Sequence, residues 1–183
     1  SIPVMSHDVF ISHSTKDKTV ADAVCSNLEN ADIRCWIAPR DIRAGDSWGS
    51  SIIKAIEQSR VMVIIFSENA NASQQVMREV ERAVQKNVVV VPFRIDGVEP
   101  TADMEYFLSA THWLDAMTPE LDAHLETLTS TVSSILNPDE SNAQAPAPKP
   151  KSVAPLAYSQ PRLAPSKKKS KLVIWIGLAA AAV

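Results

Sequence analysis

Three carboxylates lie close together in the segment Ser67–Asn87, which follows a continuously apolar run: Glu68, Glu79 and Glu81. A carboxylate that is partly removed from water has a raised pKa and suits proton transfer or the stabilisation of a developing cation. A carboxylate that remains in water is an ordinary surface group of a helix. The position of each acid on its helix therefore indicates whether it is a functional carboxylate or a solvated surface group.

The apolar residues of this segment repeat with helical spacing. The expected buried stripe consists of Val76, Val80, Ala83 and Val84. At about 100° per residue, Glu79 lies roughly 85° from the centre of the stripe, at its border, and Glu81 lies roughly 115° away on the opposite flank. Arg78 points almost directly away from the stripe, and Glu68 precedes the helix. Glu79 is thus the acid that can stand at the rim of the core, although geometry alone favours a solvated side chain at such a position.

Apolar blocks alternate with helical patterns from Ser6 to Leu136, which indicates an α/β domain. Strands are expected at 8–12, 34–38, 61–66 and 88–93, with a shorter edge strand at 111–115. Pro92 should fit only at the end of its strand. Helices are expected at 16–30, from Trp48, over the segment with the three acids, and at 118–136. The buried face of the helix that begins at Trp48 should consist of Trp48, Ile52, Ile53 and Ile56, and that of the last helix of Leu121, Leu125, Leu128, Val132 and Ile135.

Strands that alternate with helices predict a doubly wound parallel sheet, whose ligands bind at the carboxyl ends of the strands. The four histidines and the two cysteines, Cys25 and Cys35, show no metal-ligand spacing, so no metal site is expected. Two free thiols fit a reducing compartment.

Charge is distributed unevenly along the chain. The part before Ser141 holds all 21 acidic residues and 11 basic ones, a net charge of −10, whereas the remainder holds 7 basic residues and no acid. An acidic body argues against nucleic acid as a partner.

Segments outside the α/β domain also carry predictions. Residues 1–5 are interpreted as a cloning remnant and the start of the protein, and residues 6–137 as the domain. Residues 138–171, rich in Pro and Lys, are expected to be a disordered linker. The apolar run 172–183 is shorter than the roughly 20 residues of a membrane span. We interpret it as the first part of a transmembrane helix, with a sticky or amphipathic terminus as the alternative. Lysines before this run place the domain in the cytoplasm, at the inner membrane.

Five motifs in order resemble the bacterial Toll/interleukin-1 receptor (TIR) domains: "HDVFISHSTKD" (7–17), "CWIAPRDIRAGDSWGSSIIKAIEQS" (35–59), "VMVIIFSENANAS" (61–73), "REVERAV" (78–84) and "VVPFRIDG" (90–97). The resemblance covers 6–136. It implies a flavodoxin-like fold and, for many members, cleavage of the nicotinamide–ribose bond of NAD+. Some members cyclise the ADP-ribose product, bacterial members often act in anti-phage defence, and others are adaptors that only self-assemble.

The resemblance also implies site residues. The family pattern Ser-x-Trp-x-x-x-Glu falls on Ser73, Gln75 and Glu79, which makes Glu79 the catalytic residue and places Gln75 where the family often has tryptophan. An indole could stack on a nucleotide ring, whereas an amide can only hydrogen-bond. Trp36 is another candidate stacking ring, with a core aromatic as the alternative.

The segment "SHST" (12–15) matches the place where family members contact the nucleotide. Ser12, His13 and Ser14 could bind ribose or phosphate, and cap chemistry is the alternative for Ser14 and Thr15. No acid nearby in the sequence orients His13 as a general base.

The loop "APRDIRAGDSW" (38–48) matches the family's assembly loop, which also gates the nucleotide pocket. Its expected contact residues are Pro39, Arg40, Asp41, Ile42, Arg43 and Gly45. Ile42 presents an apolar tip between charges or, alternatively, anchors the loop inward. Arg40 and Arg43 could meet phosphates or an acidic neighbour.

Two functions follow from these residues. The first is an NAD+ nucleosidase that is activated by self-assembly into an oligomer or filament and needs no cofactor besides its NAD+ substrate. The second is a non-catalytic scaffold that uses the same loop, and Gln75 favours it. A phosphoacceptor domain of the response-regulator type would need an Asp at the end of the third strand, where this chain reads "IFSEN".

Overall fold

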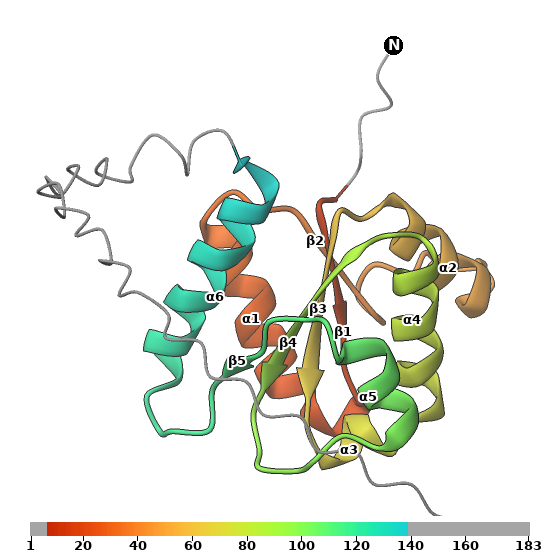
Figure 1. The fold of residues 1–183 in the computed structure, drawn as a ribbon. Helices are drawn as coiled ribbons and strands as arrows, with labels where there is room; N and C mark the ends of the chain where they lie inside the picture. The colour runs from red at the N-terminus through yellow and green to blue at the C-terminus, as the bar shows by residue number, and fades with distance from the viewer. Residues whose placement is uncertain (1–6, 139–183) are drawn as a thin grey trace, which may run out of the picture. The chain divides into compact units, whose positions relative to one another are not determined.

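A computed structural model describes residues 7–138, and the predicted linker and membrane segment lie outside these residues. Five strands form one parallel sheet in the order β2-β1-β3-β4-β5, which confirms the predicted fold class (Figure 1). The strands are β1 (Val9–Ser12), β2 (Cys35–Ile37), β3 (Val61–Phe66), β4 (Val89–Arg94) and β5 (Leu114–Asp115). Among the described residues, no helix is long and apolar enough to cross a membrane.

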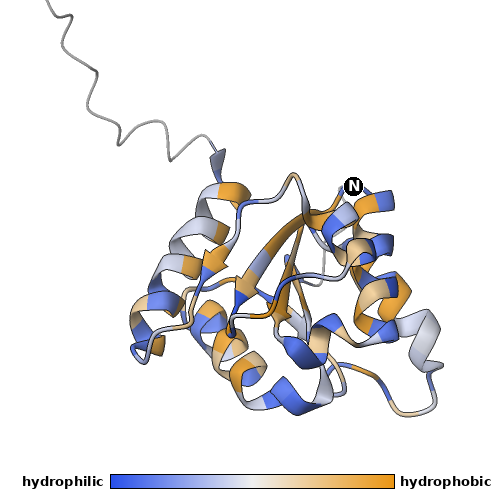
Figure 2. Cartoon of the chain, turned by 60° about the horizontal axis from the view of Figure 1, so that its bottom comes forward, coloured by the Kyte–Doolittle hydropathy of each residue, from blue (hydrophilic) through white to orange (hydrophobic). Residues whose placement is uncertain are grey.

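Helices cover both faces of the sheet. The helices α1 (Lys18–Asn30) and α6 (Leu121–Leu136) pack on one face, and α2 (Trp48–Gln58), α4 (Gln74–Gln85) and α5 (Ala102–Leu108) pack on the other (Figure 1). Two short helices, η1 (Thr15–Asp17) and α3 (Glu68–Asn71), follow the ends of β1 and β3. Figure 2 shows the apolar strands enclosed by helices whose polar residues face outward.

Alternate side chains of a strand belong to two separate hydrophobic cores, one on each face of the sheet. Val9 and Ile11 of β1 join the core under α1 and α6, whereas Phe10 joins the core under α2, α4 and α5. Successive side chains of a strand point to opposite faces of a sheet. Ser12, two residues after Phe10, therefore faces α4, and this alternation sets up the site described below.

Pro92 lies inside β4 rather than at its end, contrary to the expectation. The backbone N–H of Val89 donates to Arg60 and that of Ile95 to Phe66, so odd-numbered residues of β4 turn their polar groups toward β3. Even-numbered residues face β5, because the carbonyl of Arg94 accepts from Ala116 there. β5 pairs only with Phe93 and Arg94 of β4, so no strand lies opposite Pro92 on the β5 side. A backbone N–H at position 92 would point to that side, so its absence in proline removes no hydrogen bond between strands.

Several expected elements differ in detail. The single helix expected after β3 is two helices, because Ser67 caps α3 through the N–H of Ala70 and Ser73 caps α4 through that of Val76. The pattern did not predict α5, which Thr101 caps. Trp48 and Ile53 are 55% and 44% exposed, so their expected burial is wrong. Val84 is also exposed, at 39%.

Candidate active site

Glu79 lies deeper than the helical geometry suggests. Its side chain is only 6% exposed, although it was expected at the border of the apolar stripe. Glu81 is half-buried, while Glu68 and Arg78 are exposed. Of the three acids in the segment, Glu79 alone is buried, because α4 packs on the sheet face toward which the end of β1 turns Ser12.

Both oxygens of the Glu79 carboxylate accept hydrogen bonds. The Ser12 hydroxyl donates to Oε2 at 2.6 Å, and the Gln75 amide donates to Oε1 at 3.0 Å. The Ser12 bond joins the carboxyl end of β1 to α4, while the Gln75 bond spans one helical turn. Ser12 is buried and Gln75 is exposed, so the amide forms the outer cover of the carboxylate.

Burial raises the pKa of Glu79 above its ordinary value, since a desolvated carboxylate loses the water that stabilises its charge. The hydrogen bonds from Ser12 and Gln75 and the nearby charge of His13 lower the pKa in part. A carboxylate that is costly to ionise and is held by two donors is the kind of group that serves as a base or a cation stabiliser.

His13 ties the end of β1 to the loop after β2. Its Nδ1 lies 2.8 Å from the carbonyl oxygen of Ser14, and its Nε2 lies 3.2 Å from that of Ala38. Carbonyl oxygens only accept, so a ring nitrogen that bears a proton donates to the carbonyl beside it, and the two contacts hold the ring between the end of β1 and the loop after β2.

Two other predicted site residues, Ser14 and Ser73, cap helices in the structure. The Ser14 hydroxyl accepts from the N–H of Lys16 at 3.4 Å, and the Ser73 hydroxyl accepts from that of Val76 at 3.3 Å. Ser73 begins the helix that carries Glu79 and thus fixes the position of its first turn.

Trp36 belongs to the core on the α4 face. It is 8% exposed and stacks on Phe10, with ring centroids 5.0 Å apart. This contact is that of a core aromatic, which was the alternative for this residue.

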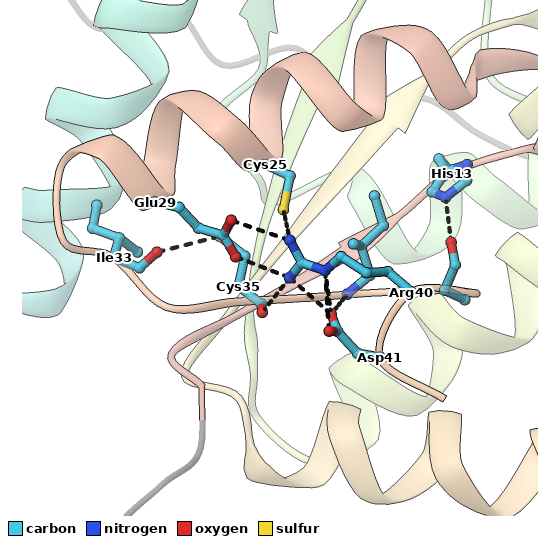
Figure 3. A network of polar contacts seen from close by, with 9 residues as sticks. His13, Cys25, Glu29, Ile33, Cys35, Arg40 and Asp41 are labelled. Carbon is cyan, nitrogen blue, oxygen red and sulfur yellow. Dashed lines mark hydrogen bonds and ion pairs between the residues drawn. The ribbon is translucent and has the colours of Figure 1, made fainter. Parts of the chain in front are cut away.

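Arg40 lies away from Glu79, on the α1 face of β2. Its guanidinium donates to Glu29 Oε1 at 2.9 Å and to Asp41 Oδ2 at 2.9 Å (Figure 3). Arg40 thus meets acidic neighbours, one of the two roles open to it from the sequence. Ser12, His13, Gln75 and Glu79 form one cluster that excludes Arg40.

The loop after β2 (38–48), which the resemblance implies to be the assembly loop, is anchored at several points. Asp41 Oδ2 accepts from the N–H of Ile37 at 2.8 Å, and the half-buried Ile42 packs on the α4-side core. Ile42 therefore serves as an anchor, while Pro39, Arg43 and Gly45 are exposed. Gly45 has a φ of 92°, a conformation that side chains disfavour.

A second buried carboxylate at the same sheet edge was not predicted. Asp17, 8% exposed, accepts from the Ser67 hydroxyl at 2.5 Å and from the Asn69 amide at 3.2 Å. This contact joins η1 to α3 across the ends of β1 and β3. The sequence contained a signal for this contact, because the segments that hold Asp17 and Ser67 follow β1 and β3, two parallel strands whose carboxyl ends lie at the same edge of the sheet. Within residues 7–138, no group of His, Cys, Asp and Glu could hold a metal ion.

Comparison with known proteins identifies the family. The model of the TIR domain matches residues 9–129. The chain belongs to the TIR domain family. The sequence resemblance is confirmed at this level, while bacterial origin stays a prediction.

A curated relative of this TIR domain, from Brachypodium distachyon, bears the name probable 2' cyclic ADP-D-ribose synthase BdTIR. It is 30% identical over 112 residues, which cover 56% of this chain and 50% of the relative. The chain thus spans about half the length of this relative.

Two solved structures share the TIR fold. The TIR domain of the Toll-related receptor TRR-2 from Hydra magnipapillata is 20% identical, with a TM-score of 0.59 over 69% of this chain and 98% of that one. A TIR-STING receptor from C. gigas, in complex with 2',3'-cGAMP, is 23% identical, with a TM-score of 0.53 over 67% of this chain and 39% of that one.

Proposed function

We propose that this TIR domain cleaves NAD+ at the nicotinamide–ribose bond, with Glu79 as the catalytic carboxylate. The observation that carries the proposal is the burial of Glu79 at the carboxyl edge of the sheet, where it is held by Ser12 and Gln75. Ligands of doubly wound sheets bind at this edge. The name of the plant relative supports an activity toward ADP-ribosyl groups.

The chemistry requires one well-placed anion. Nicotinamide departs as a neutral molecule from a cationic precursor, so no acid has to protonate it. The ribose that remains resembles an oxocarbenium ion, which a nearby carboxylate stabilises as in glycoside hydrolysis. In a dry site this interaction is stronger than in water. Ionised Glu79 can supply this charge once the exposed Gln75 amide turns aside to admit the substrate.

The group that attacks the ribose after nicotinamide has left determines whether the product is linear or cyclic. Attack by water gives ADP-ribose, and attack by a hydroxyl of the same molecule gives a cyclic isomer. Glu79, with its raised pKa, is suited to remove the proton from either acceptor. The plant relative's name includes a 2' cyclic product, which makes cyclisation the first product to seek.

Self-assembly is the second part of the proposal. Two apolar side chains of α2, Trp48 and Ile53, are exposed, and they follow the assembly loop that ends near Ser47. A second copy seated there would exclude water and fix the loop. The exposed aromatic also favours the alternative function, a scaffold that assembles without turnover. A bacterial setting, anti-phage defence and attachment to the inner membrane remain predictions from the sequence.

The test measures nicotinamide release by chromatography from concentrated protein incubated with NAD+. Glu79→Ala should reduce release at least about a hundredfold, the scale of losing a transition-state charge contact. Glu81→Ala, on the same helix, should retain activity. Undiminished release by Glu79→Ala would refute the site assignment. No release by the wild type, even when it is clustered on beads, would favour the scaffold.

A further inference from the structure

Asp17 stands at the start of α1 but does not cap it. Aspartate is favoured at this position because its side chain can accept from the free N–H groups of the first turn. The Asp17 side chain makes no such bond. Its two oxygens accept instead from the segment after β3, Oδ2 from the Ser67 hydroxyl at 2.5 Å and Oδ1 from the Asn69 amide at 3.2 Å. The carboxylate therefore joins the segment after β1 to the segment after β3.

Ser67 transmits this contact to α3. Its hydroxyl has one hydrogen, which it donates to Asp17, and its oxygen accepts from the N–H of Ala70 at 3.0 Å. Asp17 thus fixes the orientation of the hydroxyl that caps α3. The loop after β4 holds α3 from another side, because the N–H of Glu68 donates to Asp96 Oδ2 at 2.7 Å. Figure 1 shows α3 at the end of the sheet toward which the strand arrows point.

The position of α3 determines where α4 begins. Only Ala72 and Ser73 separate the two helices. The N–H of Ser73 donates to the carbonyl oxygen of Ala70 at 3.0 Å, and the side chain of Ser73 caps α4. A displacement of α3 therefore moves the first turn of α4, which carries Gln75. Glu79 follows on the same face of the helix, about one turn later.

Two side-chain contacts thus link the same two segments of the chain. The Ser12–Glu79 bond joins the end of β1 to α4, and the Asp17–Ser67 bond joins η1 to α3. Between Ser12 and Asp17 the chain makes a tight turn, closed by the bond from the N–H of Asp17 to the carbonyl oxygen of Ser14 at 2.9 Å. The two bonds and the chain between them form a closed ring, so a shift at one bond changes the geometry of the other.

Apolar packing alone does not place Glu79 accurately. Val76, Val80 and Ala83 bury one face of α4 in the core, but hydrophobic burial has no preferred direction. A functional side chain has to be held to within about 0.5 Å, and a misplacement of about 1 Å can cost a hundredfold in rate. Hydrogen bonds are directional, so the bonds of Asp17 can supply the accuracy that the core does not.

We propose that Asp17 is a positioning residue of the Glu79 site. Its bonds to Ser67 and Asn69 hold α3 and the start of α4, so that Glu79 stays within reach of the Ser12 hydroxyl. Asp17 acts through α3 and takes no part in bond cleavage itself. The consequence for NAD+ cleavage rests on the proposed function, whereas the placement of Glu79 can be measured without NAD+.

Titration of Glu79 in the full chain, followed by carbon-13 NMR of the side-chain carboxyl groups, tests the placement. Asp17→Asn keeps the shape of the side chain, but Ser67 and Asn69 can no longer both donate to it. The Ser12 bond lowers the pKa of Glu79, so its weakening in Asp17→Asn should raise the pKa of Glu79 above that of the wild type. Removal of a nearby negative charge would lower that pKa instead, and a loss of stability alone would leave it unchanged. An unchanged or lowered pKa of Glu79 in the folded variant overturns the proposal.

Three further variants serve as controls. Asp22→Asn makes the same substitution at an exposed position of α1 and should leave the pKa of Glu79 unchanged; a rise equal to that in Asp17→Asn would refute the role of Asp17. Asn69→Ala removes only the longer bond and should give a smaller rise, which can be measured even where Asp17→Asn does not fold. Ser67→Ala combined with Asp17→Asn should give no larger rise than Asp17→Asn alone, because both act through one bond. Additive rises would contradict that shared path.

Activity gives a separate measurement. Asp17→Asn should lower kcat for NAD+ cleavage about tenfold and change KM by less than about twofold, because the displaced carboxylate acts in the transition state. An unchanged kcat would overturn the catalytic consequence of the placement. If the wild type releases no nicotinamide, the proposed function fails, and the titration still decides whether Asp17 positions Glu79.

Discussion

Replacing Glu79 by Gln should stabilise the domain at neutral pH. The substitution removes a buried charge and preserves the shape of the side chain. The new amide oxygen can accept from the Ser12 hydroxyl, and the Gln75 amide can turn its own oxygen toward the new NH2 group. Both hydrogen bonds therefore survive, and the cost of burying an ionised carboxylate disappears.

The sign of the pH dependence follows from the raised pKa of Glu79. Between the ordinary carboxyl pKa and the raised value, the folded protein binds more protons than the unfolded chain, so stability falls as pH rises through this interval. The loss is complete above the raised pKa. A polar group that burial leaves incompletely compensated costs about 1–3 kcal/mol, which is the expected gain for Glu79→Gln above that interval. Below the ordinary carboxyl pKa the two proteins should be equally stable.

Urea unfolding followed by circular dichroism, at a series of pH values, measures this difference in the free energy of unfolding. The control is Glu81→Gln, because the body of the chain is acidic and removal of any carboxylate lowers its self-repulsion. The control should show little gain. The reasoning is refuted if Glu79→Gln is less stable than the wild type at every pH, or if Glu81→Gln shows the same gain.

Three further substitutions test neighbouring parts of the account. Ser12→Ala should move the acidic limb of the activity–pH profile to higher pH, because the Ser12 hydrogen bond lowers the pKa of Glu79; an unmoved limb would argue against this bond during turnover. Gly45→Ala should cost about 1 kcal/mol of loop stability, since φ is 92° there, and should weaken self-association in sedimentation; unchanged oligomers would contradict the loop assignment. Trp48→Ser should also weaken self-association while changing the free energy of unfolding by less than about 0.5 kcal/mol, and a larger loss of stability would show that the ring is part of the core.

Elements with strong local patterns were predictable from the sequence. β3 spans the expected 61–66, because a short, continuously apolar run is typical of a strand that helices cover on both faces of a parallel sheet. α5 was not predicted, since it is only seven residues long and Met104 and Leu108 supply its buried contacts. The burial of Trp48 and Ile53 was predicted wrongly, because helical periodicity marks an apolar stripe but not how much of it a neighbour covers.

The site itself was predictable only in part. Helical geometry ranked Glu79 above Glu81, but the hydroxyl of Ser12 comes from a strand 67 residues away, and local patterns carry no information on such contacts. The contact of Arg40 with Cys25 was also not predictable from local patterns, because it depends on how α1 packs beside β2.

The central claim is tested most directly by NAD+ cleavage in matched assemblies. Wild type, Glu79→Gln and Glu81→Gln are brought to the same oligomeric state, verified by sedimentation, and nicotinamide release is then measured for each. The account predicts release by the wild type and Glu81→Gln and loss of release in Glu79→Gln, although that variant is folded and more stable. Release by Glu79→Gln at the rate of the wild type would contradict the assignment of Glu79 as the catalytic carboxylate.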